Sequence, residues 1–257
     1  MRDDRYVHRD DVQNCWYKNF CDKYGTDACT SHCKKFTQTD YLFQMSNLPK
    51  SMWKAQDLDT SSLSDEVINS LDIIRADIEF FVKKGFNLYL FGKPGTGKTS
   101  WAVKLMNNYF AQVAETTAYN TRGLYVSVPS FLRDAKLNMT YKSEDYREFL
   151  REIQNCDVVI WDDIGQTDPT QYESQWLYSY INERMFSKKC NIFTSNLTPN
   201  ELRVMDHRLE SRVCGSSDCL CVSGPDRRKR NTYAEFLNSL EMSEDDTASS
   251  SEQDTES

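Results

Sequence analysis

The sequence predicts an α/β fold in which a parallel β-sheet is covered by helices on both faces. Between residues 64 and 240, short apolar runs typical of buried strands alternate with segments whose apolar residues recur at helical spacing. A glycine-rich loop directly follows the first of these strands. Strands that alternate with helices form parallel sheets, and such sheets bind ligands at the carboxyl ends of their strands.

Three amphipathic helices are predicted in this region. The first spans residues 64 to 85, with Ser64 placed to cap its start and Gly85 suited to its end. The second follows the glycine-rich loop, and the third precedes the last predicted strand. Their apolar faces are formed by Val67, Leu71, Ile74, Ile78 and Phe81; by Trp101, Leu105, Met106 and Tyr109; and by Trp176, Leu177, Tyr180, Ile181 and Met185.

Four buried strands are predicted, at residues 87–91, 124–128, 158–161 and 191–194. The glycine-rich loop follows the first strand, and polar side chains follow the third and the fourth. These positions share one edge of a parallel sheet, which is where a ligand site is expected.

The predicted organisation has four parts: a Cys-rich N-terminal region at 1–50, a polar linker at 51–63, the α/β domain at 64–240 and an acidic tail at 241–257. The low-complexity tail has too little to bury and is predicted to be disordered. It holds seven acids and no base, so the chain's formal charge of −8 becomes −1 without it. Net charge alone therefore does not predict a nucleic-acid partner.

The sequence favours a cytoplasmic location. No apolar run reaches the roughly 20 residues that a membrane helix needs, and the first residues lack the apolar core of a secretory signal. No membrane partner is expected. In a reducing setting the nine cysteines are predicted to be thiols or metal ligands rather than disulfides.

The loop after the first strand matches the pattern G-x-x-x-x-G-K-[ST] at every fixed position. Its glycines let backbone N–H groups turn toward phosphates, and the following helix adds its positive end. Lys98 is placed to neutralise the β- and γ-phosphates of ATP, and the Thr99 hydroxyl to bind Mg²⁺. The predicted nucleotide-binding residues are Gly92, Lys93, Pro94, Gly95, Thr96, Gly97, Lys98, Thr99 and Ser100.

Acidic and amide residues end the next strands. Asp162 is predicted to hold Mg²⁺ through water, and Asp163 to orient and deprotonate the attacking water. The amide of Asn196 is placed to sense the γ-phosphate or that water. Each pattern alone is weak, because polar residues often end solvated strands. Their order after the phosphate-binding loop makes them one predicted catalytic site with Lys98.

Two arginine groups have more than one interpretation. Arg208 and Arg212 lie four residues apart on one helix face, as solvated side chains or as arginines supplied to the γ-phosphate of a neighbouring subunit. The basic run at 227–230 is a second phosphate sensor, a nucleic-acid contact or a solvated turn.

Taken in order, these motifs resemble the bacterial and phage helicase loaders of the DnaC and DnaI type, which share their ATPase module with the IstB transposition helpers. The resemblance covers residues 65 to 232. It rests on NLYLFGKPGTGKT, LYVSVPSFLRDAK, VVIWDDIG, INERMFSKKCNIFTSNLTPNEL, and RLESRV followed by GPDRR.

The resemblance implies an AAA+ fold with a reduced C-terminal lid, and ATP bound between self-associating subunits. In that frame Lys98 and Thr99 bind ATP and Mg²⁺, and Asp162 and Asp163 form the Walker B pair. Asn196 is then the first sensor. Many AAA+ proteins have glutamate where this chain has Asp163; the shorter acid is usual in the loaders and is compatible with slow hydrolysis.

The resemblance also implies an arginine finger at Arg212 or Arg208, with Arg212 preferred, and a second sensor at Arg228. Its implied partners are a hexameric replicative helicase and single-stranded DNA. In the loaders, helices before Walker B help to bind DNA, and the matching segment here is 129–155. That segment has the basic and aromatic residues which DNA binding requires, although solvated helix faces have them too: Arg133, Lys136, Tyr141, Lys142 and Tyr146.

Four cysteines near the N-terminus are candidate Zn²⁺ ligands: Cys15, Cys21, Cys29 and Cys33. Four thiolates bind Zn²⁺ tetrahedrally and can order a segment too small for its own core, with His8 and His32 as substitutes. The spacing lacks paired C-x2-C knuckles, so a loosely folded arm with reduced thiols is the alternative. The resemblance favours zinc, because such loaders often carry an N-terminal zinc module that contacts the helicase.

The expected function is ATP-dependent loading of the helicase onto single-stranded DNA, with slow hydrolysis that is stimulated by DNA or the partner and controls assembly and release. An IstB-like transposition helper shares the motifs, although the Cys-rich N-terminus favours a loader. An ATP-dependent adaptor with little turnover is kept open by Asp163. A nucleotide kinase fits least well, because of the Asn196 sensor and the paired arginines.

Overall fold

The computed structural model describes residues 15, 21–26, 28–30, 33–53, 58, 60–116, 118–141, 143–166 and 169–227, with the backbone alone for 138–141. The chain divides into two units, residues 1–225 and 226–257, and nearly all described residues belong to the first. The predicted acidic tail lies outside the described residues. None of the helices in the described ranges has the length and apolar character needed to cross a membrane.

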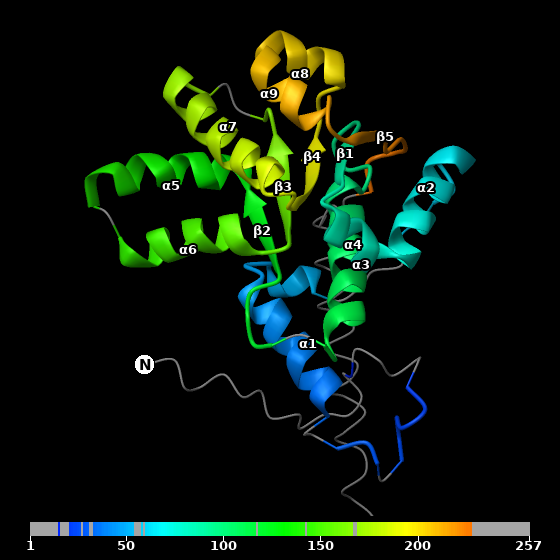
Figure 1. Cartoon of the computed structure of the whole chain (residues 1–257). Helices are drawn as coiled ribbons and strands as arrows, with labels where there is room; N and C mark the ends of the chain where they lie inside the picture. Colours follow the sequence, from blue (N-terminus) through cyan, green and yellow to red (C-terminus); the bar gives the residue numbers. More distant parts are fainter. Residues whose placement is uncertain are drawn as a thin grey trace, which may run out of the picture. The chain divides into compact units, whose positions relative to one another are not determined.

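A five-stranded parallel sheet forms the centre of the first unit (Figure 1). The strands are β1 Asn87–Phe91, β2 Gly123–Ser127, β3 Val158–Ile164, β4 Cys190–Ser195 and β5 Asp218–Cys221. They run in the order β2-β3-β4-β1-β5. The four predicted strands are confirmed. β5 was not predicted, because its four residues are mostly exposed and show no apolar run.

Helices cover both faces of this sheet, as predicted (Figure 1). Successive residues of β3 alternate between two apolar cores: Val158 and Ile160 face one, Val159 and Trp161 the other. The first core is covered by α1 Lys34–Met45, α2 Asp65–Ala76, α3 Ile78–Lys84 and α4 Lys98–Val113. The second is covered by α5 Val128–Tyr141, α6 Glu144–Asn155, α7 Gln171–Phe186, α8 Pro199–Met205 and α9 His207–Val213.

The helix predicted at residues 64–85 is two helices, α2 and α3. Its ends are as predicted: the Ser64 side chain accepts a hydrogen bond from the Val67 N–H, and Gly85 closes α3 in the left-handed conformation. The helix breaks at Asp77, whose backbone angles of −127° and 48° are not helical. Apolar residues keep their helical spacing across the break, so the sequence pattern did not reveal it.

Part of the predicted N-terminal region belongs to the apolar core. Leu42 and Leu48 are buried there, and the ring of Phe43 meets Phe110 of α4 edge-on at 5.4 Å between centroids. A short 3-10 helix, η2 Lys50–Met52, follows. Next to it, Trp53 stacks on Phe43. The structure thus places α1 and the start of the predicted linker on the α/β domain.

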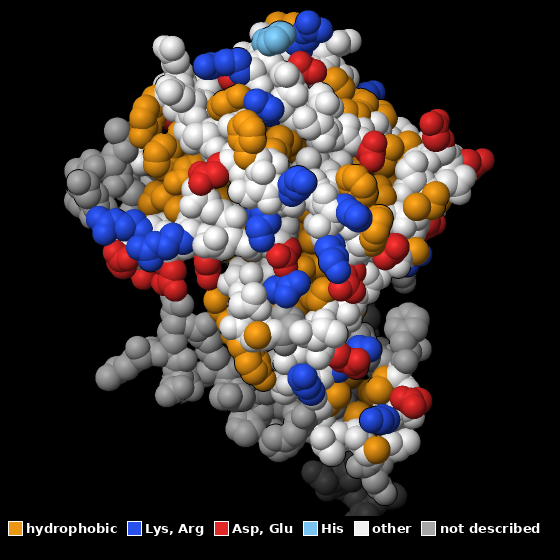
Figure 2. All heavy atoms as spheres, viewed as in Figure 1, with side chains coloured by type: hydrophobic (Ala, Val, Ile, Leu, Met, Phe, Trp, Pro, Cys, Tyr) orange, Lys and Arg blue, Asp and Glu red, His pale blue; other side chains and the backbone are white. Residues whose placement is uncertain are grey.

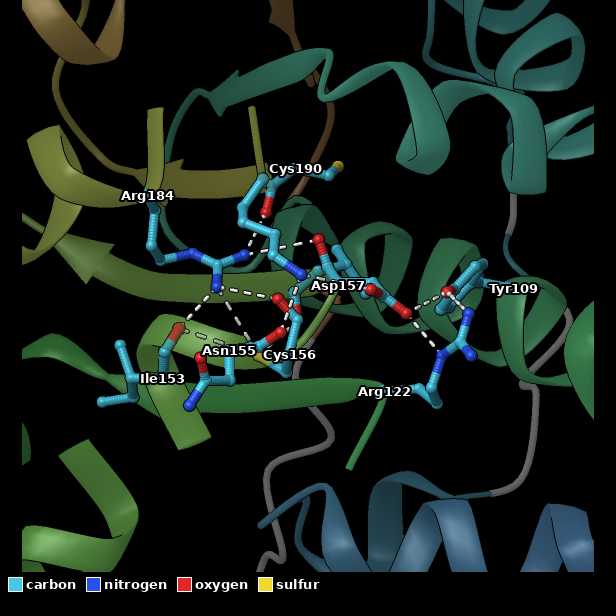
Figure 3. Close-up of polar contacts among 10 residues, drawn as sticks. Tyr109, Arg122, Ile153, Asn155, Cys156, Asp157, Arg184 and Cys190 are labelled. Atoms are coloured by element: carbon cyan, nitrogen blue, oxygen red, sulfur yellow. Dashed lines mark hydrogen bonds and ion pairs between the residues drawn. The ribbon is translucent and has the colours of Figure 1, made fainter. Parts of the chain in front are cut away.

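A buried arginine joins three elements at the amino end of the sheet (Figure 3). Arg184 of α7 is fully buried, and burial lowers the pKa of its guanidinium, although an arginine stays charged in proteins. The guanidinium donates to the carbonyl oxygens of Cys156 at 3.0 Å and Cys190 at 2.7 Å, and to Asn191 Oδ1 at 2.8 Å. It therefore ties the end of α6 and the start of β4 to α7.

A reciprocal capping box begins α7. The Glu173 carboxylate accepts from the Thr170 N–H at 2.7 Å, and Thr170 Oγ1 accepts from the Glu173 N–H. Lys136 Nζ lies 2.9 Å from the same carboxylate. The hydrogen bond from the Thr170 hydroxyl, followed by that from Lys136, lowers the pKa of Glu173 to about 2.

Glu173→Gln is expected to lower the free energy of unfolding at neutral pH by about 1 kcal/mol, which is the usual size of a helix cap. Because the pKa is lower in the folded protein than its ordinary value of 4.5, the charged carboxylate stabilises the fold. That contribution is complete above pH 4.5 and is lost as the pH falls toward 2. Urea unfolding of both proteins across this range should show the difference shrinking; a difference independent of pH would contradict the assignment.

Candidate nucleotide-binding site

The predicted phosphate-binding loop lies between β1 and α4. Gly97, with φ of 99°, precedes α4, and no side chain caps this helix. Its first N–H groups are therefore available for an anion. Gly92 is also required, because a Cβ atom there would lie 2.3 Å from the carbonyl oxygen of Val222.

Lys98 is almost fully buried at the start of α4. Its Nζ donates to the carbonyl oxygens of Gly92 at 3.0 Å and Lys93 at 2.8 Å. It also donates to Asn196 Oδ1, just after β4, at 2.9 Å. The structure therefore brings the predicted sensor amide beside the lysine of the loop.

Asp162 near the end of β3 accepts hydrogen bonds from three hydroxyl groups. Thr99 Oγ1 and Thr194 Oγ1 each lie 2.7 Å from its Oδ1, and the Tyr125 hydroxyl lies 2.6 Å from its Oδ2. Burial, together with the charges of Asp162 and Asp163, raises the pKa of Tyr125, so its hydroxyl stays protonated and donates. The carboxylate is thus held by donors from two strands, β2 and β4, and from α4.

Sequence reasoning missed Tyr125 and Thr194. Thr194 carried a weak signal, since it is a polar residue inside an apolar strand two positions before Asn196. Tyr125 carried none, because an aromatic residue in a strand usually serves packing.

A β-bulge separates Asp162 from Asp163. Trp161 pairs with Phe193, but the next pair joins Ile164 to Ser195, so β3 carries one extra residue. Asp163 takes the left-handed conformation, with φ of 62°, and its N–H donates to Thr194 Oγ1 at 3.0 Å. Aspartate tolerates this conformation better than most residues. The bulge changes the direction of the second carboxylate relative to regular strand alternation.

The Thr99 hydroxyl and the Asp162 carboxylate are hard oxygen ligands of the kind that Mg²⁺ prefers. They meet at 2.7 Å beside a helix start suited to phosphates, so the residues fit a Mg²⁺–nucleotide complex. When bound, Mg²⁺ neutralises charge on the phosphate oxygens.

The candidate arginine fingers lie on α9 and contact α7. Arg212 Nε donates to the Tyr178 hydroxyl at 3.3 Å, and its guanidinium lies 5.6 Å from the ring of Phe186. The Arg208 guanidinium lies 6.0 Å from the Tyr178 ring. The structure does not bring either one to Lys98 within the described residues. Arg228, the predicted second sensor, lies outside them.

The candidate DNA segment at 129–155 corresponds to α5 and α6. Its basic side chains lie beside acids: Arg133 beside Asp134 at 3.3 Å, and Lys136 beside Glu173 at 2.9 Å. Figure 2 shows basic and acidic side chains side by side over α6, at the left of the view. Exposed ion pairs are weak, so this pairing does not prevent phosphate contacts. Lys142 and the side chain of Tyr141 lie outside the description.

All nine cysteines are described, and none forms a disulfide. Within the part of the chain that the structure describes, no three His, Cys, Asp or Glu side chains come together as a metal site. The geometry therefore does not support Zn²⁺ at Cys15, Cys21, Cys29 and Cys33. His8 and His32 lie outside the described residues.

The strand order, the loop after β1, the acidic pair in β3 and the amide after β4 define a P-loop ATPase of the AAA+ class. The sequence model of the bacterial DnaA ATPase domain matches residues 69–217, which is more than half of the chain. The chain belongs to the family of the bacterial DnaA ATPase domain.

Two curated relatives cover its ATPase region. The chromosomal replication initiator protein DnaA of Ureaplasma parvum serovar 3 is 28% identical over 163 residues, 62% of this chain and 34% of the relative. The replicative helicase loader DnaI of Bacillus subtilis strain 168 is 26% identical over 180 residues, 66% of this chain and 55% of the relative. The chain thus spans about a third and about half of their lengths.

Solved structures share the fold. A crystal structure of DnaI superposes with a TM-score of 0.55 at 24% identity, over 70% of this chain and 94% of that one. The DnaC helicase loader superposes with the same TM-score at 20% identity, over 68% of this chain and 100% of that one.

Proposed function

We propose that this ATPase loads a hexameric replicative helicase onto single-stranded DNA in the bacterial or phage-infected cytoplasm. The observation that carries the proposal is the similarity over 180 residues to a protein named as a replicative helicase loader. The site supports the ATP-dependent part, because Lys98, Asn196 and the Thr99–Asp162 pair meet at one edge of the sheet.

Each residue then has a distinct task. Lys98 and the helix start hold the phosphates, and Asp162 orients the Thr99 hydroxyl. Asp163 receives the proton of the attacking water. An aspartate is one methylene shorter than a glutamate, so we expect slow hydrolysis that DNA or the helicase stimulates. Asn196 senses the γ-phosphate.

Subunit contacts provide the switch. Arg212 or Arg208 reaches the γ-phosphate of a neighbouring subunit, and hydrolysis removes that contact and releases the loader. Arg228 serves as the second sensor. The DNA backbone is held by α5 and α6 through residues such as Lys136. This lysine can leave Glu173 and pair with a phosphate of the DNA instead.

An ATP-dependent adaptor with little turnover is the second candidate, and Asp163 is the observation that favours it. The two candidates differ in the ratio of ATP binding to ATP turnover. An adaptor binds Mg²⁺–ATP tightly but shows no stimulation of hydrolysis by DNA or helicase. An IstB-like transposition helper would bind a transposase in place of the helicase.

The wild-type protein is expected to co-purify with the replicative helicase of its host. The experiment is done with and without ATP, and the amount of helicase retained is compared. Cys21→Ser should lose the complex and, if the four N-terminal cysteines hold a metal, about one zinc per chain by elemental analysis. Cys219→Ser is the matched control, because Cys219 is a solvent-accessible thiol that lies on β5 and not in the N-terminal region.

Three outcomes separate the hypotheses. Loss of the complex in Cys21→Ser alone supports a zinc-ordered helicase contact. A complex kept by both variants, in a protein without zinc, overturns the zinc assignment but not the loader. No complex under any condition overturns the loader assignment and directs the search to transposase partners.

A further inference from the structure

Tyr125 contacts the nucleotide site with its side chain and the N-terminal part of the chain with its backbone. Its hydroxyl donates to Asp162 Oδ2 at 2.6 Å. Its backbone N–H donates to the carbonyl oxygen of Ser46 at 2.7 Å, and its carbonyl oxygen accepts from Asn47 Nδ2 at 3.2 Å. A single residue therefore links the connection after α1 to the carboxylate of Walker B.

The sheet order explains why these backbone groups are available. β2 is an edge strand, so one side of its backbone has no neighbouring strand. An edge of this kind presents N–H and C=O groups that another segment can pair with. Residues 46 and 47 pair with Tyr125 at this edge.

The connection after α1 is also fixed to α1 itself and, through Phe43, to the core. Ser46 is fully buried, and its hydroxyl donates to the Phe43 carbonyl oxygen at 2.7 Å. Asn47 adopts φ of 57°, a conformation that asparagine tolerates. Phe43 in turn packs in the core against α4. A displacement of α1 would therefore be transmitted to β2 rather than absorbed by a slack loop.

We propose that Tyr125 is a positioning residue that couples the N-terminal region to the Mg²⁺ side of the nucleotide site. The inference rests on the proposed ATPase function, but not on the identity of the partner. Binding at the N-terminal region would move the Ser46–Asn47 connection and, through Tyr125, change how Asp162 is oriented. A pocket of about 410 Å³ lined by Asn47, Tyr125 and Tyr146 opens beside this junction.

The Tyr125 hydroxyl differs from the other two hydroxyls that donate to Asp162 in the oxygen that it contacts. Thr99 belongs to α4 and Thr194 to β4, and both donate to Oδ1. Tyr125 alone holds Oδ2 among the contacts described, so losing its hydroxyl leaves the orientation of the carboxylate to the two donors on Oδ1.

The test uses Tyr125→Phe, which removes only the hydroxyl. A fluorescent ATP analogue is titrated onto the full chain with excess Mg²⁺ and again with EDTA. Affinity in EDTA should be unchanged, which also shows that the variant is folded. The gain in affinity that Mg²⁺ provides should fall about tenfold, the size expected for losing one hydrogen bond to a charged group. Tyr172→Phe, an exposed tyrosine on α7, is the matched control.

The backbone half of the coupling is tested with Asn47→Gly. Glycine keeps the left-handed conformation but removes the amide that contacts Tyr125. The Mg²⁺-dependent gain should fall by a smaller factor than in Tyr125→Phe, and the double variant should be no worse than Tyr125→Phe alone, since both act through one hydroxyl.

Each contrary result has one meaning. If Tyr125→Phe keeps the full Mg²⁺-dependent gain in affinity, the positioning role is overturned. The proposed function still stands in that case, provided that the wild-type protein binds the nucleotide. An additive double variant, or an Asn47→Gly protein identical to wild type, overturns the part of the link that runs through the Asn47 amide. A wild-type protein that binds no nucleotide overturns the proposed function itself.

Discussion

Lys98→Ala is expected to reduce ATP turnover at least about a hundredfold, the effect of removing one preorganised charge from a reacting group. The amine is buried and lies beside the Asn196 amide and two loop carbonyl oxygens, so no solvated side chain can replace it. ATP binding should weaken as well, because the γ-phosphate loses its cation. Steady-state turnover and equilibrium binding measure the two effects separately.

Lys104→Ala is the matched control, because Lys104 lies on the same helix but stacks on Trp101. Its turnover should equal that of the wild type. If Lys98→Ala retained normal turnover, the loop at 92–99 would not be the hydrolytic site, and the proposed ATPase function would be wrong.

Arg184→Met is expected to cost about 3 kcal/mol or more in the free energy of unfolding, because it removes a buried charge that satisfies oxygen acceptors at the end of α6 and at the start of β4. For a domain of this size that loss lowers the melting temperature by roughly 10 °C. The arginine lies at the amino end of the sheet, opposite the loop, so the folded variant should still bind nucleotide.

Arg203→Met provides the comparison, since Arg203 is exposed on α8. Its melting temperature should stay within a few degrees of the wild type, as for most surface substitutions. Equal melting temperatures for Arg184→Met and wild type would show that the carbonyl groups find other partners. The hydrogen bonds of Arg184 would then not be a main source of stability.

The strands and most of the nucleotide site could be predicted because their signals are local. Lys98 and Thr99 follow the first buried strand and Asp162 lies near the end of the third, and a parallel sheet necessarily brings such strand ends together. Tyr125 and Thr194 could not be assigned, since their roles depend on which hydroxyls converge on one carboxylate. That convergence is decided by strand order, which spacing along the chain does not specify.

Other differences have similar physical causes. The break at Asp77 leaves the apolar period intact, so periodicity cannot detect it. The bulge at Asp163 depends on a register that only the partner strand reveals. The Cys-rich composition suggested that residues 1–50 form a separate region. The contacts of Leu42, Phe43 and Leu48 with the core are tertiary, so composition could not reveal them.

The packing of α1 on α4 also limits how modular this protein can be. A fragment that began at residue 64 would uncover the apolar patch now filled by Leu42, Phe43 and Leu48, and would tend to aggregate. Exchange of the N-terminal region between relatives, by recombination or in the laboratory, would therefore need its junction before residue 33. In a hybrid joined there, the recipient would keep its own α1 and its own contact with β2, while acquiring a new specificity upstream.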